Sequence, residues 1–146
     1  MTRPLPATQP LSDTVFVTGQ IQAEDVAELA DCGVTIIVNN RPDGEEAEQP
    51  PGADIEAAAR AAGLDYVHIP IADAFSAEKV AAMGEALANA EGNVVIFCKS
   101  GTRSAYLWAL ARARQGADAD ELMFRASQAG YNLRPIQRWL KEAGQT

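Results

Sequence analysis

The stretch that decides the fold reads Val94-Val95-Ile96-Phe97-Cys98-Lys99-Ser100-Gly101-Thr102-Arg103-Ser104. Its first four residues form an apolar run, which is typical of a strand buried on both faces. A helical pattern follows from Ser104 to about Arg114 and stops at Gly116. The loop between them therefore brings Cys98 to the carboxyl edge of a predicted sheet.

Three other apolar segments predict further strands, and helical periodicity fills the stretches between them. The expected strands are 15–17, 34–38, 66–69 and 94–97, and the expected helices are 23–32, 55–62, 76–91, 104–114, 118–128 and 135–143, with Asp54 and Ser76 as N-caps. Strands that alternate with helices predict one three-layer α/β/α domain with a mainly parallel sheet of four to five strands. We expect residues 1–12 to be an irregular lead-in and residues 13–146 to form the domain.

The composition is that of a globular protein, with 47% hydrophobic and 22% charged residues in a chain of 146. The net charge of −8 disfavours binding to nucleic acid or to an anionic membrane. No segment has the length of a membrane span, so we expect a soluble, cytoplasmic protein. Its two cysteines make no disulfide framework, no side-chain cluster has the spacing of metal ligands, and no cofactor is implied.

The loop after the fourth strand is expected to bind an anion. Between Cys98 and the helix lie Lys99, Ser100, Gly101 and Thr102, whose backbone N–H groups can curl around one point. The positive end of the following helix strengthens such a site, and glycine allows close approach. Lys99 is expected on the rim, with a solvated role as plausible as a functional one.

The same surroundings favour the thiolate of Cys98. Arg103 can clamp two oxygens of a phosphate, and the Ser104 hydroxyl could donate to the sulfur. The plain alternative is that Cys98 is a small buried apolar residue.

Four motifs of this chain together resemble a bacterial family. They are Val17-Thr18-Gly19-Gln20, the segment from Val38 to Glu45, His68-Ile69-Pro70, and the segment from Cys98 to Ser104. They are similar to the phosphatase-like domain of the β-lactamase-hydrolase-like proteins, over roughly Asp13 to Leu140. The resemblance implies a protein tyrosine phosphatase-like fold and a functional link to a metallo-β-lactamase-fold hydrolase of sulfide metabolism.

The resemblance implies a cysteine-dependent hydrolase of phosphate monoesters, acting through a thiophosphoryl intermediate on a small phosphate ester or a phosphoprotein. The loop departs from the phosphatase pattern, since four residues rather than five separate Cys98 from Arg103 and Phe97 stands where His is usual. A rhodanese-like sulfurtransferase uses a loop of this length, so a persulfide carried on Cys98 is the alternative. A third possibility is an anion-binding or redox module without turnover.

One acidic residue, Asp73, and one basic residue, Arg41, could complete the site around Cys98. The resemblance places the general acid at Asp73, although a solvated loop carboxylate is an equal reading. Arg41 lies in the long loop over 39–53 and could contact substrate, but an Arg41–Asp43 pair that orders the loop is at least as plausible.

Three other residues have less definite roles. His68 is expected to be structural, and Cys32 to be packing unless it is a redox partner of Cys98. Tyr131 either packs over the anion loop or belongs to the core.

Overall fold

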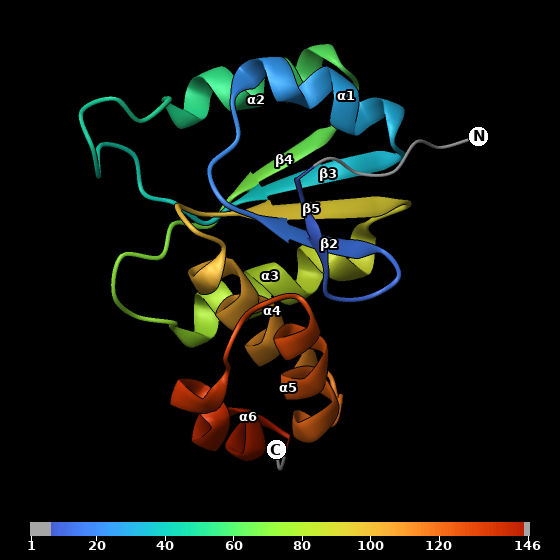
Figure 1. Cartoon of the computed structure of the whole chain (residues 1–146), viewed down its shortest axis with the longest axis vertical. Coiled ribbons are helices and arrows are strands. Elements are labelled where there is room, and N and C mark those ends of the chain that lie inside the picture. The colour runs from blue at the N-terminus through green and yellow to red at the C-terminus, as the bar shows by residue number, and fades with distance from the viewer. Residues whose placement is uncertain (1–6, 145–146) are drawn as a thin grey trace.

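The computed structural model describes residues 7–144, and its centre is a five-stranded sheet in the order β1-β2-β5-β3-β4 (Figure 1). The strands are β1 (Gln9–Pro10), β2 (Val15–Thr18), β3 (Val34–Asn39), β4 (Asp65–His68) and β5 (Asn93–Phe97). All neighbours pair in parallel except β1, which is antiparallel to β2. The carboxyl ends of four strands therefore meet at one edge of the sheet, and β5 lies in the middle of it.

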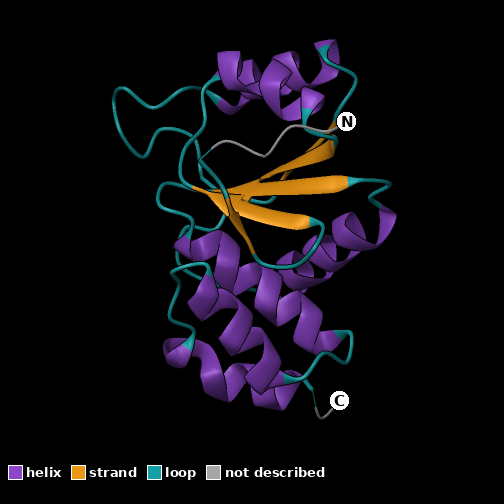
Figure 2. Cartoon of the chain, turned by 45° about the vertical axis from the view of Figure 1, so that its right-hand side comes forward, coloured by secondary structure: helices purple, strands orange, loops and turns teal. Residues whose placement is uncertain are grey.

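Helices cover both faces of the sheet. They are α1 (Val26–Asp31), α2 (Gly52–Ala61), α3 (Ala77–Asn89), α4 (Thr102–Arg114), α5 (Ala119–Gln128) and α6 (Gln137–Ala143), with short 3-10 turns at Ala23–Asp25 and Arg134–Ile136. α1 and α2 lie on one face, α3 and α4 on the other, and α5 and α6 pack on the outer side of α4 (Figures 1 and 2). The predicted three-layer α/β/α architecture is confirmed.

β5 contributes alternate side chains to two cores. Val95 and Phe97 pack on the side of α1 and α2, whereas Val94 and Ile96 pack on the side of α3 and α4. All four are at most 1% exposed. Because successive side chains of a strand point to opposite faces, a fully apolar run fits only a strand with a helical layer on each side. Because β5 is packed on both faces up to Phe97, it fixes the place of Cys98, the next residue.

Two expected boundaries at the amino-terminal side are wrong. Gln9–Pro10, predicted to be irregular, pairs as an edge strand with β2. α2 begins at Gly52 with Pro51 at the N-cap position, so Asp54 lies inside the first turn. Residues 1–6 of the expected lead-in lie outside the described residues.

The helix boundaries further along are closer to expectation. Ser76 caps α3 as predicted, because its side chain accepts from Lys79 N. That helix ends at Asn89, before the predicted stop at Gly92. α4 begins at Thr102, two residues earlier than expected, because Gly101 at φ 97° supplies the left-handed turn that precedes it. Within residues 7–144, no helix combines the length and apolar character needed to cross a membrane.

Candidate active site

Cys98 directly follows the end of β5 and is wholly buried. Its Sγ accepts a hydrogen bond from Gly101 N at 3.1 Å. α4 starts at the next residue, Thr102, and the first N–H groups of a helix have no intrahelical acceptor. The sulfur thus lies at the positive end of α4, as the sequence predicted.

The carbonyl groups of the loop are held on its outer side. Lys99 O accepts from Gln20 N at 3.2 Å, and Ser100 O accepts from Tyr131 Oη at 3.0 Å. In a trans peptide the carbonyl and the next N–H point in opposite directions. These contacts therefore turn the N–H groups of Ser100 and Gly101 away from the outer side, and that of Gly101 reaches the sulfur.

Arg103 is fixed by two partners. Its Nη1 and Nη2 bind the two oxygens of Glu45 at 2.7 and 2.9 Å, and Nη1 also donates to Ile71 O at 2.7 Å. The hydrogen bond to Glu45, followed by the charge of the Cys98 sulfur, raises the pKa of Arg103, while burial opposes the rise. The sequence-predicted pair of Cys98 and Arg103 is therefore brought together, with Glu45 as an additional partner.

Glu45 lies between two arginines. Hydrogen bonds from Arg103 and then Arg41 lower the pKa of its carboxyl to about 2, although burial acts in the other direction. Glu45 is therefore ionised at neutral pH, and it cannot serve as a proton donor there.

Arg41 is only 3% exposed and fastens the β3–α2 loop from inside. Its Nε binds Glu45 Oε1 at 2.9 Å, its Nη1 binds Gln20 Oε1 at 3.0 Å, and its Nη2 binds Glu46 Oε1 at 2.7 Å. The predicted Arg41–Asp43 pair is wrong, because Asp43 Oδ1 instead accepts from Gly52 N at 2.7 Å. Arg41 thus orders the loop, with different acidic partners from the one expected.

The Ser104 hydroxyl has a different partner from the expected sulfur. It donates to Asn40 Oδ1 at 2.7 Å, and both residues are fully buried. Asn40 Nδ2 in turn donates to Ile69 O at 3.0 Å. A hydroxyl carries one proton, so in this arrangement Ser104 ties α4 to the ends of β3 and β4 and does not donate to Cys98.

The rim of the loop carries weaker contacts. Lys99 Nζ pairs with Glu46 Oε1 at 3.0 Å, with side chains 62% and 53% exposed. Lys99 and then Arg41 lower the pKa of Glu46. Ser100 Oγ donates to Thr102 Oγ1 at 3.2 Å. An exposed pair of this kind contributes little to stability, and Lys99 lies on the rim as predicted.

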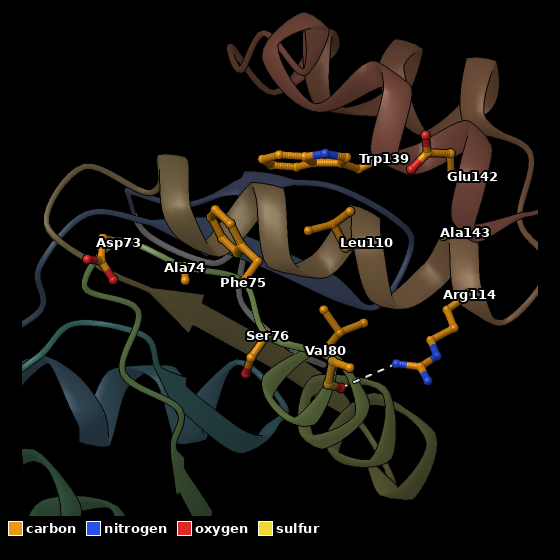
Figure 3. Close-up of a pocket in the computed structure, with 11 residues that line it drawn as sticks. Asp73, Ala74, Phe75, Ser76, Val80, Leu110, Arg114, Trp139, Glu142 and Ala143 are labelled. Carbon is orange, nitrogen blue, oxygen red and sulfur yellow. Dashed lines mark hydrogen bonds between the residues drawn. The ribbon is translucent and has the colours of Figure 1, made fainter.

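Asp73 lies on an exposed bend after β4, at one end of an apolar groove (Figure 3). The groove has a volume of about 740 Å³, and Phe75, Leu110 and Trp139 are among the apolar residues that line it. No hydrogen bond or ion pair within residues 7–144 joins Asp73 to Cys98 or Arg103. Its loop is nevertheless tethered to the site, because Arg103 binds the carbonyl of Ile71 two residues earlier.

His68 is structural, as predicted, since its Nε2 lies 2.9 Å from Arg41 O. Cys32 lies at the far edge of the sheet, where its carbonyl accepts from the Asn93 side chain at the start of β5. The length of β5, roughly 17 Å, separates that edge from Cys98, so a direct disulfide between the two cysteines is excluded.

Sequence reasoning missed the roles of Gln20, Asn40 and Glu45, although all three lie within the motifs that carried the family resemblance. Gly19 explains one more motif position, because a Cβ there would lie 2.8 Å from Lys99 O. Gln20, Asn40 and Glu45 each bind a residue of the segment from Cys98 to Ser104. Only the folded chain shows these partners.

A cysteine and an arginine on a strand–loop–helix turn, at the carboxyl edge of this sheet, define a protein tyrosine phosphatase-like α/β domain. The chain belongs to the family described as "Beta-lactamase hydrolase-like protein, phosphatase-like domain", which matches residues 8–115. The predicted fold and the predicted family are both confirmed.

The relatives differ in how far they extend beyond this chain. A β-lactamase hydrolase-like protein from Xylella fastidiosa is 35% identical over 133 residues, which are 90% of this chain and 31% of the relative. The chain therefore spans about a third of the length of such curated relatives. A candidate phosphatase from Neisseria meningitidis has a similar structure, with a TM-score of 0.81, 32% identity and coverage of 94% and 98% of the two chains.

A more distant structure supports the fold alone. It is a kinase-associated phosphatase in which serine replaces the catalytic-site cysteine. Its TM-score is 0.72 at 17% identity, and the match covers 97% of this chain and 95% of the other.

Proposed function

We propose that this chain is a cysteine-dependent phosphatase that hydrolyses phosphate monoesters, with Cys98 as the nucleophile. The observation that carries the proposal is the sulfur at the amino end of α4, 3.1 Å from Gly101 N, beside the anchored Arg103. Backbone N–H groups and a guanidinium around one point can bind the oxygens of a phosphate.

In the first step, an electron pair of the Cys98 sulfur forms a bond to phosphorus as the bond to the leaving oxygen breaks. A proton from Asp73 neutralises the leaving oxygen. In the second step, water attacks the thiophosphoryl group, gives a proton back to Asp73, and releases phosphate and the thiolate.

Asp73 is the proposed general acid because the other nearby carboxylates are otherwise engaged. Glu45 is ionised between two arginines, and Asp43 binds the backbone of Gly52. Ile71, held by Arg103, lies two residues before Asp73, and two residues span at most about 7 Å. A small rearrangement of the bend would bring the carboxyl toward the leaving group.

The test is hydrolysis of an aryl phosphate by the wild type, Cys98→Ser and Cys32→Ser. Turnover should be lost in Cys98→Ser, and Cys32→Ser serves as the control because its site lies at the far edge of the sheet. Acid quenching should trap one phosphoryl group on Cys98, detected by peptide mass. Turnover that survives in Cys98→Ser would refute the mechanism.

The loop of six residues keeps sulfur transfer as a competing outcome. If incubation with thiosulfate adds one sulfur to Cys98 while aryl phosphates stay intact, the sulfurtransferase replaces the phosphatase. Binding of inorganic phosphate without either reaction would instead indicate a module without turnover.

A further inference from the structure

The peptide between Ser100 and Gly101 is held at both ends. Its carbonyl oxygen accepts from Tyr131 Oη at 3.0 Å, and its N–H donates to Cys98 Sγ at 3.1 Å. The peptide is trans and planar, so its two polar groups point in opposite directions and turn together. A rotation that removes the carbonyl from Tyr131 also removes the N–H from the sulfur.

Tyr131 is brought to this peptide by the segment after α5. Gly130, at φ 95°, ends the helix, and Tyr131 N donates to Ala126 O at 2.8 Å. The neighbouring Asn132 carbonyl accepts from Tyr106 Oη at 3.3 Å. The turn at Gly130 and the bond from Tyr131 N thus hold the backbone of Tyr131 beside the anion loop, without any contact to Cys98.

The contact requires glycine beneath the ring. A Cβ at Gly101 would collide with the hydroxyl of Tyr131. Because no side chain stands at that position, the tyrosine hydroxyl can approach the backbone of the loop itself.

Tyr131 remains a hydrogen-bond donor over the working pH range. Burial, and then the negative charge of Cys98, raise the pKa of its hydroxyl. The proton that binds Ser100 O is therefore retained at neutral and mildly alkaline pH.

We propose that Tyr131 is a positioning residue, which locks the Ser100–Gly101 peptide so that its N–H stabilises the negatively charged sulfur of Cys98. Tyr131 lies outside residues 8–115, the part matched by the family. Its effect on turnover rests on the proposed function, but its effect on the sulfur does not.

The experiment measures alkylation of Cys98 by iodoacetamide between pH 5 and 9, read by peptide mass so that Cys32 does not interfere. We compare the wild type, Tyr131→Phe and Tyr106→Phe. The control also loses a hydroxyl that binds a backbone carbonyl of the same segment, but that hydroxyl does not touch the anion loop. The charged groups around the loop are unchanged in both variants; they are Arg41, Glu45, Glu46, Lys99 and Arg103.

Tyr131→Phe should slow alkylation about three- to tenfold near pH 6, the range expected for one lost hydrogen bond, and leave the alkaline plateau unchanged. Tyr106→Phe should match the wild type within about twofold. The proposal is overturned if Tyr131→Phe keeps the wild-type profile, if both variants shift equally, or if alkylation changes by the same factor at every pH. Thermal unfolding of both variants checks that the fold is intact.

Hydrolysis of an aryl phosphate separates this proposal from the proposed function. A phosphatase should show kcat/KM of Tyr131→Phe reduced near pH 6 and recovered toward alkaline pH. If the wild type shows no turnover but the alkylation shift is present, the function fails and the role of Tyr131 stands.

Discussion

Glu45 ties together two parts of the chain that are far apart in sequence, the β3–α2 loop and the start of α4. Its carboxylate binds Arg103 through two nitrogens and Arg41 through a third. A planar guanidinium held along one edge has little freedom to rotate, so the orientation of Arg103 toward the sulfur depends on an ionised Glu45.

The state of Glu45 makes the stability of the fold dependent on pH. Its folded-state pKa of about 2 lies below the ordinary value of 4.5, so folding favours the ionised form. This contribution is fully present above pH 4.5 and is lost as the pH falls toward 2. We expect Glu45→Gln to unfold at lower urea concentration than the wild type at pH 7, and the difference to disappear between pH 4.5 and 2.

Glu48→Gln is the matched control, because Glu48 is an exposed carboxylate of the same loop. A Glu45→Gln deficit of the same size at pH 2 and pH 7 would show that the ion pair is not its source.

The first turn of α2 is capped by Asp43, a residue that lies outside the helix. Its N-cap position is Pro51, which offers no side-chain acceptor, and the backbone N–H of Gly52 binds Asp43 Oδ1 instead. A carboxylate at this place satisfies an orphan N–H and complements the helix dipole. The β3–α2 loop therefore caps the first turn of α2.

Asp43→Ala should lower the stability by about 1 kcal/mol, the usual effect of removing a helix cap, which corresponds to about 2–4 °C in Tm. Asp43→Asn keeps the acceptor and should lose less. Thermal unfolding followed by circular dichroism measures both. Equal losses would show that the charge, and not the hydrogen bond, stabilises this end of α2.

The net charge of the whole chain is −8, and this charge opposes the approach of an anionic substrate. Near the sulfur, Glu45 and Glu46 largely neutralise the nearby cations Arg41, Lys99 and Arg103. We expect kcat/KM for a dianionic aryl phosphate to rise about two- to threefold from 10 to 150 mM KCl as the repulsion is screened. A decrease with salt would mean that local attraction dominates.

The sequence predicts the architecture better than the details of the site. The β-branched run of β3 and the double-sided burial of β5 follow from local patterns. The strand at Gln9–Pro10 does not, since two residues carry no periodicity and their pairing depends on β2. Likewise, the bond between Glu45 and Arg103 joins residues 58 positions apart, and no spacing rule connects them. The roles of Cys98 and Arg103 can be predicted because both residues lie in one segment of six consecutive residues.

Trp139 stands 51% exposed over the groove that begins at Asp73, whereas Trp108, the other tryptophan, is 3% exposed in the core. An aqueous quencher such as iodide would therefore act almost entirely on the emission of Trp139. Trp139 lines the same groove as the proposed acid, so the fluorescence of the unlabelled protein can record whether the groove changes when an anion binds.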